Sequence, residues 1–263
     1  MRYIPSGLLC AASIFAFAHG ASAADMPIKA PAYQAPVAGY NWSGFYVGGN
    51  FGYGWGANSD PGVSVIDATG LGLGAFAAAG GFPITAVNPN GIIGGGQAGY
   101  NWQTNAFVFG LVADFQGADM KRDSTFVASP PGFVTGTTNV DRKLDWFGTV
   151  RGKLGWAVDN VLLYATGGLA YGHVKDSLTF SGSPTGISGA GSNSETRAGW
   201  TAGAGLAYGW GQWSVGVEYL CMDLGSSDTT MTFAGYPGAA TDSVTVSNDN
   251  KVNLVRALIN YRF

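Results

Sequence analysis

Charge is scarce in this sequence. Only 11% of the 263 residues are Asp, Glu, Lys or Arg, and the formal net charge is −3. A protein that binds nucleic acid needs clustered Lys and Arg to meet the phosphates, and the sequence has no such patch. The composition therefore predicts that nucleic acid is not a partner.

Cysteine and histidine are also scarce, with two of each. Cys10 lies in the apolar N-terminal stretch, which we predict below to be a cleaved signal peptide. The mature chain then keeps only Cys221 and cannot form an intrachain disulfide. No Cys/His spacing typical of zinc is present, and His173 is the one histidine that remains once the signal peptide is removed. The glycines of residues 94–99 fit G-x-G-x-x-G but lie inside a predicted strand rather than before a helix. We therefore predict no catalytic residues, no cofactor and no metal.

Long hydrophobic runs are missing as well. After the N-terminal region no stretch approaches the ~18 consecutive apolar residues of a membrane helix. The N-terminus itself carries Arg2, a short apolar stretch over residues 8–18, and Ala21-Ser22-Ala23 before Ala24. This is the pattern of a cleavable secretory signal, so we predict a signal peptide over residues 1–23. Residues 24–42, rich in Ala and Pro, are predicted to form an extended periplasmic leader.

Glycine and aromatic residues are abundant, and they alternate with polar residues. At the C-terminus, Val255, Ala257, Ile259, Tyr261 and Phe263 alternate with more polar positions that include two arginines. A period of two indicates an extended strand with one apolar face. A strand that ends on an aromatic residue, with arginines on its other face, suits a barrel wall that is apolar outside and wet inside. We predict that Phe263, Tyr261 and Ile259 form the signal for barrel assembly.

Eight such alternating segments follow one another from Ser43 onward. The links between them alternate strictly between tight turns and long connections, and the long ones are predicted to be loops over residues 55–90, 118–140, 175–196 and 223–250. This arrangement is typical of an all-β, eight-stranded antiparallel up-and-down transmembrane β-barrel, which we assign to residues 43–263. The predicted strands are approximately residues 44–54, 91–103, 106–117, 141–157, 161–174, 197–210, 212–222 and 251–263.

Aromatic residues fall at two heights when these segments are aligned. Membrane barrels carry aromatic girdles at both lipid interfaces, whereas the alternative of a secreted β-sandwich or adhesin gives no reason for two belts. The belt near the tight turns contains Phe45, Trp102, Phe107, Trp156, Trp210, Trp213, Tyr261 and Phe263. The belt near the long links contains Tyr53, Phe115, Trp146, Tyr171, Trp200 and Tyr219.

Charged residues on the opposite face of the strands are the best candidate functional residues. Two interpretations remain open for them: an ion-pair network that plugs the barrel, or a narrow conduit whose charges govern ion passage. An eight-stranded barrel has room for side chains and little else, which favours the plug. The predicted inward charges are Asp114, Asp145, Arg151, Lys153, Glu218, Arg256 and Arg262.

Several segments resemble motifs of a known family. These segments are Asn41–Gly48, Asp145–Gly152, Tyr164–Gly172 and Glu218–Gly225. They are similar to the first, fourth, fifth and seventh strands of the alphaproteobacterial outer-membrane proteins of 25 to 31 kDa, often labelled porin-like. The resemblance covers the whole mature chain and implies an eight-stranded outer-membrane barrel. Some members are credited with haem binding, others with envelope integrity and host interaction.

Two positions depart from the family pattern. Cys221 stands where an aromatic residue is usual, and Val112 stands where an acidic residue is expected. The second departure means that the interior charges of the family cannot be transferred unchanged to this chain.

The expected function is non-enzymatic: a structural protein of the outer membrane that supports envelope integrity and exposes surface loops. The alternatives are a porin-like channel for small solutes, a surface protein whose loops bind haem or a host ligand, with His173 as the candidate haem contact, and a lipid-modifying enzyme. The expected partners are outer-membrane lipid, lipopolysaccharide and the barrel-assembly machinery. The sequence leaves the oligomeric state open.

Overall fold

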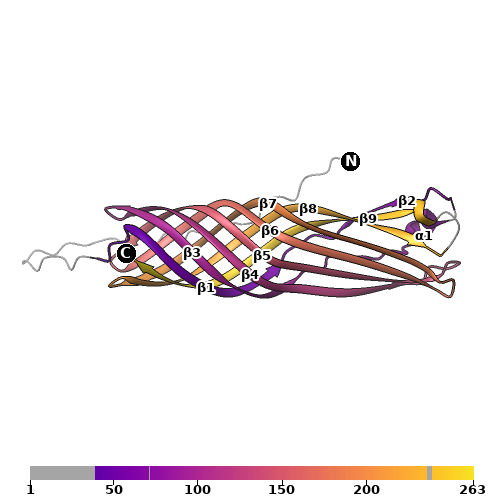
Figure 1. The fold of residues 1–263 in the computed structure, drawn as a ribbon, viewed down its shortest axis with the longest axis horizontal. Helices are drawn as coiled ribbons and strands as arrows, with labels where there is room; N and C mark the ends of the chain where they lie inside the picture. Colours follow the sequence, from indigo (N-terminus) through magenta and orange to yellow (C-terminus); the bar gives the residue numbers. More distant parts are fainter. Residues whose placement is uncertain (1–38, 71, 236–238) are drawn as a thin grey trace, which may run out of the picture. The chain divides into compact units, whose positions relative to one another are not determined.

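The computed structural model describes residues 39–70, 72–235 and 239–263, and these form a closed antiparallel barrel (Figure 1). Each strand pairs with the next, and β1 pairs with β9 to close the ring, which confirms the predicted fold. The predicted signal peptide and residues 24–38 of the leader lie outside the described residues. The barrel strands are β1 Gly44–Gly56, β3 Asn90–Thr104, β4 Phe107–Ala128, β5 Thr135–Val158, β6 Val161–Ser183, β7 Ile187–Trp210, β8 Trp213–Ala234 and β9 Ser243–Arg262.

Three tight turns join strands at one end of the barrel. Asn105, Asp159 and Gly211 occupy them with φ values of 55°, 51° and 57°. Asn, Asp and Gly tolerate this left-handed conformation better than other residues, so each turn has a suitable residue where one is required. Gly39 and Phe263 lie at the same end, since Gly39 is next to Asp159 and the Phe263 amide donates to the Phe45 carbonyl oxygen.

In the lower part of the wall, next to these turns, the apolar side chains face outward as predicted. Its outward side chains are apolar or aromatic and exposed, and neighbouring rings contact one another within each predicted belt. Phe107 and Trp156 are 4.6 Å apart between ring centroids near the turns, and Phe115 and Trp146 are 5.5 Å apart near the other belt. Lipid is the environment in which such a surface is stable, because it removes the apolar side chains from water. Of the residues that the structure describes, no helix is long and apolar enough to cross a bilayer.

The prediction of long loops is wrong for three of the four long links. The strands β4 to β9 continue through most of residues 118–140, 175–196 and 223–250, and we call this continuation the extension. The remaining long link contains strand β2 Gly62–Ile66 and helix α1 Leu73–Ala78. Strand β2 pairs with the far part of β9, so that β2 and α1 lie at the end of the barrel opposite the C-terminus (Figure 1).

In the extension the apolar side chains point inward and the polar ones outward, the reverse of the lower wall. This reversal explains why these segments look like loops in the sequence. In β6, Leu178 and Phe180 point inward and are buried, while Ser177 and Thr179 face outward. In the lower wall of the same strand, Leu163 and Leu169 face outward instead. An extension that stands in water must bury its apolar residues inside, whereas a wall in lipid exposes them.

A β-bulge separates the two zones in β5. The pairing with β6 skips a residue between Leu144 and Trp146, which shifts the alternation by one position. Leu144 therefore points inward, although the alternation of the lower wall predicts it outward. Asp145, predicted inward, lies on the outer surface for the same reason.

The compact unit begins at Gly39, four residues before the predicted start of the barrel. Tyr40 and Trp42 are buried against Leu162 and Tyr164 inside the turn end of the barrel. The Trp42 amide donates to the Gln103 side-chain oxygen at 2.7 Å. Residues 39–42, assigned to the leader by the sequence, therefore belong structurally to the barrel.

Candidate functional site

Four charged side chains meet inside the lower wall, and we call them the lumen charge cluster: Asp114, Arg151, Glu218 and Arg256. The Arg151 guanidinium nitrogens lie 2.7 Å from Asp114 Oδ2 and 3.1 Å from Glu218 Oε2. Arg256 Nη2 lies 2.9 Å from Asp114 Oδ2 and 2.6 Å from Glu218 Oε2. Each arginine therefore bridges both carboxylates, and the cluster contains two charges of each sign.

The strand register brings these residues together. Glu218 and Arg256 are directly opposite partners on β8 and β9, and Asp114 is opposite Thr149 on β4 and β5. The Thr149 hydroxyl donates to Asp114 Oδ2 at 2.9 Å and accepts from Arg151 Nε at the same distance. All four charged residues are at most 5% exposed. Buried charges of this kind are stable only when they are paired and hydrogen-bonded, as they are here.

The other three predicted lumen charges do not join the cluster. Lys153 points inward, but its Nζ donates to the Tyr46 hydroxyl at 3.2 Å and lies over the Tyr164 ring. Arg262 lies at the turn end, where it donates to the Ser43 carbonyl oxygen and covers the Tyr40 ring.

Asp145 lies outside the barrel and forms an ion pair with Lys175 at 2.6 Å. These two side chains are 37% and 49% exposed, respectively, which excludes Asp145 from the lumen.

Apolar layers fill the lumen on both sides of the charge cluster. Toward the turns lie Tyr40, Trp42, Leu162 and Tyr164. Toward the extension lies a second layer, all of it buried: Ile93, Met120, Leu144, Phe147, Ala170, Val174, Leu220, Met222, Leu224, Val252 and Leu254. The charges are therefore enclosed between two packed layers of mainly apolar side chains.

A second polar cluster, which the sequence did not reveal, lies at the base of the extension. Arg142 Nε donates to Asp176 Oδ1 at 2.9 Å, and its Nη2 donates to Asn250 Oδ1 at 2.6 Å. The Ser227 hydroxyl donates to the other oxygen of Asp176. The sequence does indicate that Arg142 points inward, because Val140 and Leu144, two positions away on either side, are apolar. The cluster could not be predicted, because Asp176, Ser227 and Asn250 lie in segments predicted to be loops.

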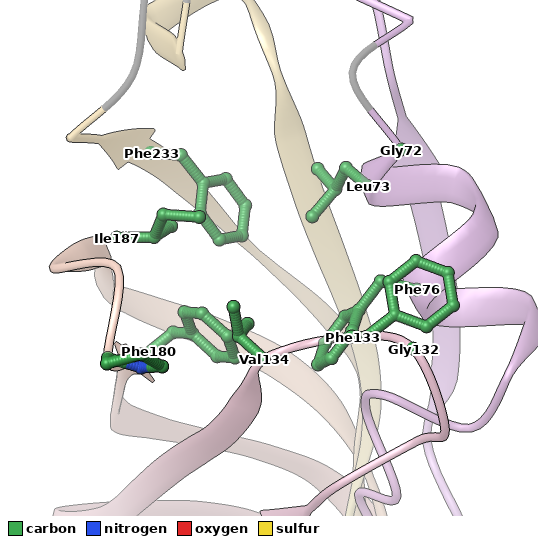
Figure 2. Close-up of a pocket in the computed structure, with 10 residues that line it drawn as sticks. Gly72, Leu73, Phe76, Gly132, Phe133, Val134, Phe180, Ile187 and Phe233 are labelled. Atoms are coloured by element: carbon green, nitrogen blue, oxygen red, sulfur yellow. The ribbon is translucent and has the colours of Figure 1, made fainter.

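A cavity of about 410 Å³ lies at the far end of the extension (Figure 2). Helix α1 contributes Leu73 and Phe76, and the other lining residues come from β6, β7 and β8 and from the connections between elements. Figure 2 shows Leu73 facing Phe233 and Ile187 across the open centre. The complete lining is Gly72, Leu73, Phe76, Gly132, Phe133, Val134, Phe180, Pro184, Ile187 and Phe233.

His173 lies on the outer surface at the upper aromatic belt. Its ring stacks on Trp146 at 5.8 Å, and its two nitrogens lie 3.3 Å from the hydroxyl oxygens of Ser194 and Thr196. Within the described ranges no group of three His, Cys, Asp or Glu side chains is placed to hold a metal ion. The imidazole is thus engaged with neighbouring side chains of the same chain.

A closed β-ring with an apolar, aromatic-belted outer wall and paired charges buried inside it defines an integral outer-membrane β-barrel protein. Residues 9–263 match the family model of the outer membrane protein beta-barrel domain, and the chain belongs to this family. Its place is therefore the cell outer membrane.

Two curated relatives illustrate the family. The chain is 36% identical over 258 residues to the 31 kDa outer-membrane immunogenic protein of Brucella melitensis, covering 94% of this chain and 95% of that protein. It is 28% identical over 211 residues to the 25 kDa outer-membrane immunogenic protein of Brucella canis, covering 78% of each. These matches confirm the predicted resemblance.

Two solved structures are similar at lower identity. The outer membrane protein OprG from Pseudomonas aeruginosa is 13% identical with a TM-score of 0.43, covering 86% of this chain and 100% of that one. Ail, the attachment invasion locus protein of Yersinia pestis, is 15% identical with a TM-score of 0.36, covering 83% and 99%. Neither likeness bears on the function of this chain.

Proposed function

We propose that this protein is a non-enzymatic structural component of the outer membrane that supports envelope integrity and does not conduct solutes. The filled lumen carries this proposal. The turn-end plug around Tyr40 and Trp42, the lumen charge cluster and the apolar layer around Phe147 follow one another along the barrel. A solute that entered the barrel would have to displace packed side chains at each of these levels.

The mechanism is mechanical. The ion pairs of the lumen charge cluster connect β4, β5, β8 and β9 across the interior, so that opposite walls of the ring are held at a fixed distance. The aromatic belts fix the height of the wall in the bilayer. A rigid, closed cylinder adds protein surface to the membrane without adding a permeability path.

Conductance in a planar bilayer tests the absence of a channel. The refolded protein should give no sizeable conductance steps under conditions in which a wide-pore porin does. Sizeable steps that shrink after Arg151→Ala or Glu218→Ala substitution would contradict the proposal and favour the porin-like channel.

The role in envelope integrity has a separate test. A strain that lacks the protein should be more sensitive to detergent, and the intact gene should restore resistance. Unchanged sensitivity of the deletion strain would exclude this role even if the barrel is closed.

We also propose lipopolysaccharide as a partner of the outer wall. Lys121, Lys143 and Lys175 are directly opposite one another on β4, β5 and β6, just beyond the upper belt, and all three are exposed. Asp119 and Asp145 form ion pairs with the two outer lysines, at 3.4 and 2.6 Å. The height of the row suits the phosphates of a lipopolysaccharide packed against the belt.

The barrel-assembly machinery is the second proposed partner. Ile259 and Tyr261 lie on the outer face of β9, and Phe263 follows the last residue of this strand. The Phe263 ring contacts Phe45 and Tyr261. Strand β9 closes the ring against β1, so these residues lie beside the closing seam. Their accessibility supports the assembly signal predicted from the sequence.

A further inference from the structure

The cavity at the far end of the extension differs from the surface around it in being apolar. The strands of the extension present mainly Ser, Thr, Asn, Asp and Lys outward and keep their apolar residues inside. At the far end the cavity instead opens an apolar lining to the outside. A concave apolar surface on an otherwise polar exterior is the usual property of a binding site.

The floor of the cavity is well packed. Phe76, Phe180 and Phe233 are buried, and Phe180 contacts each of the other two rings edge to face, with centroid distances of 5.9 Å to Phe76 and 5.7 Å to Phe233. Phe82 packs beneath Phe76 at 5.2 Å. These contacts hold the floor in place by packing against the core of the extension. The rim residue Phe133 is exposed and completes the wall.

The chemistry of the lining selects a class of ligand. All ten residues are Gly, Leu, Phe, Val, Pro or Ile, so no side chain in the wall carries a charge or a hydrogen-bonding group. A charged ligand would lose its hydration there without gaining a partner. A neutral apolar ligand loses little and removes both its own surface and the wall from water.

The volume of the cavity and the aromatic side chains in its wall narrow the class of ligand further. The volume of about 410 Å³ lies within the range of small-molecule sites. The edges and faces of Phe76, Phe133, Phe180 and Phe233 suit a ring that packs edge to face. We propose that this cavity binds a small, neutral, hydrophobic molecule, preferentially an aromatic one. This binding activity goes beyond the proposed structural role and does not depend on it.

The site captures its ligand and does not pass it through the barrel. Beneath the floor lie the buried Val140, Met231 and Val244, and below these lies the cluster of Arg142 and Asp176. A neutral apolar molecule would meet a buried ion pair before it reached the lower wall. The exit from the cavity is therefore the same as the entrance.

Methyl NMR of the protein in lipid nanodiscs tests the proposal, with indole as the probe. Isoleucine δ1 labelling places one reporter, Ile187, in the wall of the cavity. Ile92 and Ile259 face the lipid and report indole that partitions into the bilayer, while Ile66 on β2 reports non-specific contact in water. Ile187 should shift saturably, whereas the other three should change linearly or not at all.

A filling variant and a matched control localise the effect. Leu73→Trp fills the cavity and should weaken the saturable response of Ile187 at least tenfold, and Val134→Phe should do so independently. Thr179→Trp adds the same indole ring to the outer face of β6 and should leave the response unchanged. A heat-modifiability gel establishes that each variant is folded.

Three results would overturn the proposal. One is a linear response of Ile187 that matches Ile66, and another is an unweakened response in both folded filling variants. The third is saturation by a hydrophobic peptide with no response to indole, which would assign the cavity to a protein partner instead.

Discussion

At the residue scale, the interior of the barrel depends on four charges that are buried together. The sequence alternation predicted Asp114, Arg151, Glu218 and Arg256 to point inward, and in the structure all four share one cluster. It could not place Asp145, because a single extra residue in a bulge reverses which face a side chain occupies. Periodicity gives the face of a residue only within an uninterrupted ladder.

Glu218→Ala should lower the free energy of unfolding by about 3–5 kcal/mol, since it leaves two arginines buried with one carboxylate between them. Urea unfolding of the protein refolded in lipid measures the change. The matched control is Glu195→Ala, which removes a carboxylate paired with Arg197 on the more exposed extension. That variant should lose about 0–1 kcal/mol. Equal effects of the two substitutions would contradict a structural role for the lumen charge cluster.

Deletion of Phe263 should reduce the amount of assembled protein in the outer membrane several-fold. The deletion removes the exposed terminal ring beside the closing seam, which is proposed to be read during assembly. Phe51→Ala is the control, because Phe51 is a lipid-facing ring of similar exposure, 63% against 67%, within β1. Heat-modifiable protein in outer-membrane fractions is the measurement. Normal assembly without Phe263 would argue against the assembly signal.

At the element scale, each long strand combines two patterns. The lower part of β6 is apolar outside, and its upper part is apolar inside, with Leu178 and Phe180 in the core of the extension. The eight strands, the tight turns and the belts were predictable because lipid imposes one rule on all of them. The extension was not, since only its pairing partners show that a Ser- and Thr-rich segment is a strand with a buried face.

The lysine row on β4, β5 and β6 yields a prediction at this scale. Like charges opposite one another on neighbouring strands repel, and the two carboxylates of Asp119 and Asp145 offset three lysines only in part. A further anion should therefore stabilise the row. The combined substitution of Lys121, Lys143 and Lys175 by Gln should lower the lipopolysaccharide that co-purifies with the barrel several-fold. Lys251→Gln, which removes a single lysine paired with Asp249 on β9, is the control and should change little. Equal retention of lipopolysaccharide by both variants would contradict binding at the row.

At the scale of the whole molecule, buried side chains form successive layers along the barrel. An apolar plug, the lumen charge cluster, an apolar layer, the Arg142 cluster and the aromatic core of the extension follow one another from the turns outward. Along the strands the outer surface changes from mainly apolar to mainly polar just beyond the upper belt. The interior therefore keeps the barrel closed in both zones, while the exterior determines which zone lies in lipid.

The change of outer polarity predicts where the membrane ends. A spin label at Leu169→Cys should lie in lipid, because this lower-wall position is fully outward and apolar. A label at Thr179→Cys, ten residues further along the same strand, should lie in water. Both variants carry Cys221→Ser, so that the label has one attachment site among the residues that the structure describes. Power-saturation EPR in liposomes should show greater access to oxygen at the first position and greater access to a water-soluble nickel chelate at the second. Oxygen-dominated access at both positions would mean that the extension is embedded in the bilayer, and the assignment of its inverted polarity to water would then be wrong.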